Sequence, residues 1–171
     1  MSASDALYVL AAPYDRVADA AADFAEIETL YVEPHERGFD AVVLERDADG
    51  QVLVVEDRTS GAGLAIGVAA ALFPPIGVGA ALALGSGGGE TVAAVVRHVH
   101  ADIPPDELRR LAEMLEAADA GLIAVYDDAV ERKVERAISS ESCTVIRASS
   151  VDVAQLIRDA DSAAGLGLVG R

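Results

Sequence analysis

The sequence predicts an α+β fold, with one antiparallel sheet whose helices cover one of its faces. Short apolar runs, which suit strands, alternate with stretches whose apolar residues recur every three or four positions, as in amphipathic helices. Residues 59–89 interrupt this alternation, because they contain no charged residue. We therefore expect a single domain over residues 1–160, interrupted by 59–89, and a flexible tail over 161–171.

The N-terminal part predicts a strand and then a helix. Leu7–Ala12 is a short apolar run ended by Pro13, which is typical of a buried strand. Asp15 can cap the helix that follows. One apolar stripe of that helix is formed by Val17, Ala20, Phe24, Ile27 and Tyr31. Its acidic residues lie mostly off the stripe, and we interpret them as a solvated face: Asp19, Asp23, Glu26 and Glu28.

Two β-rich runs follow, and a short acidic turn joins them into a predicted hairpin. The runs are residues 39–46 and 51–58, and the turn reads Asp47-Ala48-Asp49-Gly50. Gly50 suits the left-handed backbone position of a short hairpin loop. The acidic turn lacks the remaining ligand spacing of a calcium loop, so we predict no cation site there.

The uncharged segment 59–89 predicts a helical hairpin with small-residue stripes. Pro74-Pro75 divides it into arms near 61–73 and 76–85, because proline breaks a straight helix. Small residues recur every fourth position, on one face of each arm, which allows another backbone to approach closely. These predicted interface residues are Gly63, Gly67 and Ala71 in the first arm, and Gly77, Ala81 and Gly85 in the second.

Three environments for this hairpin remain open. It can pack between subunits of a homo-oligomer, enter a membrane, or join the core of its own chain. Each arm is shorter than the roughly 20 apolar residues that span a bilayer, so neither arm is expected to cross one alone. No cluster of Lys or Arg flanks the segment, which leaves the positive-inside signal weak.

The C-terminal half continues the alternation of helices and strands. Residues 91–100 are predicted to be helical or to extend the hairpin. Pro104-Pro105 begins a helix with the stripe Leu108, Leu111, Leu115 and Ala118, for which Gly121 is the expected stop. Later elements are a strand at 122–126, a helix at 128–139, a strand at 143–148 and a helix from Ser150 to Ala160. Without the insertion, the first six elements match a ferredoxin-like split β-α-β plan, to which a helix–strand unit is appended.

Composition excludes several classes of function. The net charge is −16 and the isoelectric point is near 4.3, which repels nucleic acid, so no nucleic-acid partner is expected. Cys143 is the only cysteine, which excludes an intrachain disulfide and fits a reducing cytoplasm. The N-terminus lacks the basic and apolar regions of a signal peptide, so we expect a cytoplasmic protein, with membrane association left open.

The residues that could carry chemistry form incomplete sites. His98 and His100 are two metal-ligating types, but a transition-metal site needs a third or fourth ligand. The glycine-rich stretch 85–91 is one residue short of a phosphate loop, and Glu90 stands where that loop has lysine. Cys143 has no histidine nearby in the sequence to activate it. We therefore predict no catalytic, cofactor-binding or metal-binding residues, no cofactor and no small-molecule substrate.

The order of motifs resembles a bacterial family. The quoted features are the hairpin FDAVVLERDADGQVLVVEDRTSGAG, the following Gly/Ala/Pro-rich apolar block, the helix ending in ADAGLIAVYDD and the strand CTVIRAS. They are similar to a family of unknown function whose members are often labelled predicted membrane proteins, with stress-induced relatives. The resemblance covers roughly residues 5–160 and implies no catalytic residues. The arms broken by Pro74-Pro75 depart from a true spanning topology.

The sequence thus predicts a non-enzymatic, homo-oligomeric protein that assembles through its glycine-striped hairpin. An exposed apolar area of that size exceeds what a soluble monomer tolerates. The alternative is a membrane-associated, stress-related protein anchored by the same hairpin. A protein that binds a metal or small molecule through His98 and His100 is the third candidate.

Overall fold

The computed structural model describes residues 7–30, 40–58, 64–73, 96–97, 99–101, 103–127, 131–139 and 143–148. The strands are β1 (Leu7–Tyr14), β2 (Asp40–Arg46), β3 (Val52–Arg58), β4 (Ala120–Asp127) and β5 (Thr144–Ala148). The helices are α1 (Val17–Leu30), α2 (Leu64–Leu72), α5 (Pro105–Glu116) and α6 (Glu131–Ala137). The mixed α+β class is therefore confirmed. The second arm of the predicted hairpin, the helix from Ser150 and the tail 161–171 lie outside the described residues.

The sheet has five antiparallel strands in the order β3-β2-β4-β1-β5. β4 is antiparallel to both of its neighbours, so β1 and β2 run parallel to each other on its two sides. The ferredoxin-like plan predicted from sequence is not confirmed, because it places the third strand, and not the fourth, between the first two. Residues 120–126 of β4 are all buried, whereas β3 exposes Leu53, Val55 and Glu56. The more apolar strand takes the centre of the sheet, where both faces are covered.

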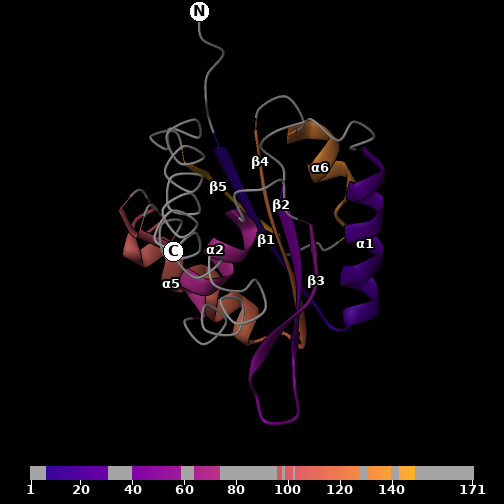
Figure 1. Cartoon of the computed structure of the whole chain (residues 1–171), viewed down its shortest axis with the longest axis horizontal. Coiled ribbons are helices and arrows are strands. Elements are labelled where there is room, and N and C mark those ends of the chain that lie inside the picture. The colour runs from indigo at the N-terminus through magenta and orange to yellow at the C-terminus, as the bar shows by residue number, and fades with distance from the viewer. Residues whose placement is uncertain are drawn as a thin grey trace, which may run out of the picture.

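Helices cover both faces of the sheet, so the expectation of helices on one face is wrong. In Figure 1, α1 and α6 lie on one side of the sheet, and α2 and α5 lie on the other. The side chains of β1 alternate accordingly: Tyr8, Leu10 and Ala12 face the α1/α6 core, and Val9 and Ala11 face the α2/α5 core. A continuous apolar run such as β1 is typical of a strand that is buried on both faces.

The β2–β3 hairpin is confirmed, and its turn has the predicted chemistry. Asp47 Oδ1 accepts hydrogen bonds from the backbone N–H groups of Asp49 and Gln51, at 2.9 Å and 2.8 Å. Gly50 has a φ of +81°, in the left-handed region that glycine adopts without steric cost. A shift in register between Val43 and Leu44, which the sequence analysis did not predict, makes Val55 an extra residue on the β3 side.

Helix α5 begins where the sequence predicted but ends earlier. Leu108, Leu111 and Leu115 are buried along one face, as the stripe indicated. Gly121, which was expected to stop the helix, is instead the second residue of β4. A Cβ atom at Gly121 would lie 2.7 Å from Leu115 Cδ2. Gly121 therefore leaves room for the end of the Leu115 side chain, and it does not mark the end of a helix.

Substitution of Gly121 by valine is expected to lower the free energy of unfolding by about 1–3 kcal/mol, the usual cost of overpacking a core. Gly121→Ala should cost less, because the contacting atom is the end of a flexible leucine side chain. Urea denaturation of both variants measures the difference. The explanation also requires coupling between the two sites, so Leu115→Ala should reduce the cost of Gly121→Val. Strictly additive effects would contradict it.

Candidate functional site

The candidate site is a hydrogen-bonded network around Asp23 in the α1/α6 layer. Asp23 is buried and only 7% exposed. Asp23 Oδ2 accepts hydrogen bonds from Tyr14 Oη at 2.5 Å, from the backbone N–H of Ser139 at 2.7 Å and from Ser139 Oγ at 2.8 Å. Tyr14 ends β1, and Ser139 lies just after α6. One carboxylate oxygen therefore joins the sheet, α1 and the connection between α6 and β5.

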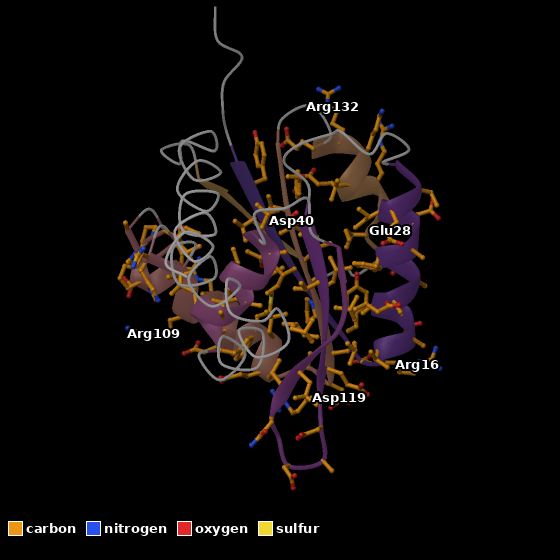
Figure 2. All side chains as sticks on the ribbon, viewed as in Figure 1. Arg16, Glu28, Asp40, Arg109, Asp119 and Arg132 are labelled. Carbon is orange, nitrogen blue, oxygen red and sulfur yellow. The ribbon has the colours of Figure 1, made fainter. Side chains whose placement is uncertain are left out.

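The position of Asp23 follows from the periodicity of α1. Asp23 is three residues after Ala20 and next to Phe24, so it lies on the face that packs against the sheet. The interpretation of all four acidic residues as a solvated face is therefore wrong for Asp23, although Glu26 and Glu28 are exposed as expected. Glu28 is labelled on α1 in Figure 2. The spacing from Ala20 and Phe24 was the signal that could have identified Asp23 from the sequence.

The Tyr14 phenol and the nearby Cys143 thiol have raised pKa values, which favour their neutral forms. Burial raises the pKa of the Tyr14 phenol above its ordinary value of 10.0, and the hydrogen bond to Asp23 raises it further. Burial also raises the pKa of the Cys143 thiol above 9.0, with an additional contribution from Glu135. A neutral thiol and a neutral phenol are poor nucleophiles. This arrangement favours a structural role for the network over nucleophilic catalysis.

A second polar feature of the same layer is the stacked pair Tyr8 and Tyr126. Their ring centroids are 5.6 Å apart and their planes differ by 12°. Tyr126 Oη is buried and has no hydrogen-bond partner among the described residues. Burial raises the pKa of Tyr126, and the carboxylates of Glu135 and Glu131 raise it further. The hydroxyl thus stays protonated in the folded chain well above neutral pH.

A shallow hollow lies on the opposite side of the molecule, at the base of the β2–β3 hairpin. Its lining includes Arg46, Phe73 and Asp119, the last of which is labelled in Figure 2. Arg46 Nε is buried and has no hydrogen-bond partner within the described parts of the chain. The space measures about 210 Å³, including the part open to solvent. The part of the hollow that can hold water measures about 10 Å³, so it is too small for a substrate.

The histidine pair and the glycine-rich stretch are only partly visible. His100 is exposed in the short helical stretch 99–101, whereas His98 and residues 85–91 lie outside the described residues. Within the described ranges, no group of three or more His, Cys, Asp or Glu side chains is placed to hold a metal ion. The two-histidine hypothesis therefore gains no third ligand from the residues that the structure describes.

Two of the six predicted interface residues lie in the described part, and both are on α2. Gly67 is buried and Ala71 is half-buried within the single chain, whereas Gly63, Gly77, Ala81 and Gly85 lie outside the described residues. Helix α2 packs against β2, β4 and α5. Among the helices of the described residues, none is both long and apolar enough to cross a membrane.

Comparison of the chain with protein-family models, with curated proteins and with solved structures finds no match.

Proposed function

We propose that this protein is a non-enzymatic homo-oligomer that assembles through the second half of its uncharged segment. The observation that carries the proposal is the placement of α2, the first arm. It lies on the sheet of its own chain, and its buried residues are Ala65, Gly67, Val68, Ala69, Ala70 and Leu72. A helix that is apolar on all sides needs cover on all sides. The first arm therefore serves as an anchor for the uncharged segment.

This placement divides the proposed roles of the two small-residue stripes. Gly67 already packs inside the chain, so a bulky residue there would disturb the monomer as well as any assembly. The contact between subunits is assigned to Gly77, Ala81 and Gly85, where i, i+4 spacing puts small residues on one helical face. The charge of −16 opposes association of identical chains, so an apolar contact must supply the favourable free energy.

The substitution Ala81→Leu is expected to reduce the mass of the particle measured by light scattering after purification without detergent. The bulkier side chain would prevent close approach of two backbones along the stripe. Ala25→Leu is the matched control, because Ala25 is exposed on α1 and far from the stripe in sequence. An unchanged mass for Ala81→Leu would contradict the proposal. Recovery of the wild-type chain in the membrane pellet, with release only by detergent, would favour the membrane-anchored alternative instead.

We also propose that the sheet is a variant of the ferredoxin-like plan. β1–α1–β2 and β4–α6–β5 each connect two strands through a helix, and both helices lie on the same face. Under this proposal β3, α2 and α5 form an insertion that covers the other face. Membership of the family of predicted membrane proteins with stress-induced relatives likewise stays a proposal, supported by the motifs quoted from the sequence.

A further inference from the structure

The outer edge of β3 has the features of a contact surface. Among the described strands, β3 pairs with β2 alone. Val52 and Val54 pack partly against the α2/α5 core, so Leu53 between them faces the α1/α6 side. Leu53 is 47% exposed and Val55 is 43% exposed, and they are the large exposed apolar side chains of the described residues. Exposed apolar residues on an edge strand favour pairing with another strand.

The backbone directions along β3 follow from the bonds of β2. The N–H of Arg46 donates to the carbonyl oxygen of Asp119 and therefore points away from β3. Val52, which lies opposite Arg46 in the ladder, therefore shares no hydrogen bond with it. Along an antiparallel ladder, pairs with and without mutual hydrogen bonds alternate. Val54, two residues after Val52, lies opposite Leu44 and likewise shares no hydrogen bond with it. Val52 and Val54 therefore direct their N–H and C=O groups toward the edge of β3 that has no partner among the described strands.

We propose that β3 pairs antiparallel with β3 of a second copy of this chain, with Leu53 opposite Leu53 on the two-fold axis. Val52 of each copy then lies opposite Val54 of the other, and the two pairs exchange four backbone hydrogen bonds. Leu53 meets its counterpart on one face of the joined sheet, and the valines meet on the other. Gln51 lies opposite Val55, where the register shift ends the pairing, so every directly opposed pair within residues 51–55 is uncharged.

Other symmetric registers fit less well. Pairing centred on Glu56 would place two carboxylates opposite each other. Pairing centred on Val55 would need regular backbone groups at the position where the register shift interrupts β3. Registers centred on Val52 or Val54 pair one of these residues with itself and place the other opposite Gly50 or Glu56, whereas the Leu53 register pairs Val52 with Val54 twice. Like net charges still oppose this contact, so association should strengthen as ionic strength rises.

This inference rests on the proposed function, because it names a second contact of the same assembly. A pairing of a few residues buries less than the roughly 1,200 Å² of a standard interface. Strand pairing is therefore expected to orient the subunits and to act together with the stripe at Gly77, Ala81 and Gly85. It would join two five-stranded sheets into one continuous sheet.

A cysteine cross-link tests the register directly. Leu53→Cys and Val55→Cys are each made in a Cys143→Ser background, and both proteins are oxidised under mild conditions. Cα atoms of a directly opposed pair without hydrogen bonds are about 4.5 Å apart, within disulfide range. In the proposed register the two Val55 positions are four residues apart along the strands, about 14 Å, which is too far. We expect a covalent, reducible dimer from Leu53→Cys and none from Val55→Cys, although both sites are similarly exposed.

The outcomes separate this inference from the proposed function. Absence of a dimer from folded Leu53→Cys, or equal cross-linking of both variants, would overturn the strand pairing. A selective dimer from Leu53→Cys together with an unchanged mass for Ala81→Leu would support the strand contact and reject the stripe contact. Circular dichroism and a thermal melt of each reduced variant establish that the fold is retained before oxidation.

Discussion

Replacement of Asp23 by alanine is expected to lower the free energy of unfolding by about 3 kcal/mol. The substitution removes the acceptor of three hydrogen bonds, and a protein hydrogen bond contributes about 1 kcal/mol net, so the loss of all three accounts for about 3 kcal/mol. It also leaves the buried Tyr14 hydroxyl without its acceptor. Because the network joins β1, α1 and the α6–β5 connection, we further expect faster amide hydrogen exchange in α6 and β5.

Glu26→Ala is the matched control for this prediction. Glu26 belongs to the same helix and carries the same kind of group, but it is exposed, so its loss should change stability by less than about 0.5 kcal/mol. A double-mutant cycle of Asp23→Ala with Tyr14→Phe should show strong coupling, since both changes remove the same bond. If Asp23→Ala cost no more than Glu26→Ala, the network would not stabilise the fold.

Alkaline pH is expected to destabilise the protein steeply, because two buried tyrosines hold their protons. The pKa values of Tyr14 and Tyr126 are raised in the folded chain, mainly by burial, whereas an unfolded chain releases these protons near pH 10. The stabilisation is therefore complete below pH 10 and is lost as the pH rises toward the folded pKa values. Each tyrosine should lower the free energy of unfolding by about 1.4 kcal/mol per pH unit above pH 10.

Urea unfolding at pH 9, 10 and 11 measures this dependence. Tyr126→Phe should reduce the slope above pH 10, and Tyr14→Phe should reduce it to a similar extent. Tyr126→Phe should do so without a loss at neutral pH, because its hydroxyl has no partner among the described residues. Tyr14→Phe should already lose stability at neutral pH, since it removes the bond to Asp23. Identical slopes for wild type and both variants would contradict the assignment.

Local signals predicted the individual elements well. Asp47 and Gly50 define the β2–β3 turn through bonds within five residues, and Leu108, Leu111 and Leu115 define the buried face of α5. Both signals lie in contiguous sequence and need no knowledge of distant partners. The strand order depends on which of β3 and β4 is the more apolar and takes the centre of the sheet, and these strands are far apart in the sequence. Local patterns therefore did not determine the order.

The candidate site was missed for the same physical reason. The spacing from Ala20 and Phe24 places Asp23 on the buried face of α1, but local patterns do not identify its partner Ser139, which is 116 residues away in sequence. The small-residue stripe shows that local spacing can predict a packing face without identifying its partner. Spacing at Gly67 and Ala71 predicts a helix face suited to close packing, but not which surface packs there, and α2 lies against the sheet of its own chain.

The central place of β4 has a consequence for synthesis. β1, α1, β2 and β3 are all translated before Ala120, the first residue of β4, yet the two neighbours of β4 meet only through it. At about 5–20 residues per second, the ribosome needs several seconds to proceed from the end of β3 to β4. The nascent chain therefore carries unpaired edges on β1 and β2 throughout that interval. Unpaired strand edges of this kind make a partly synthesised chain prone to aggregation.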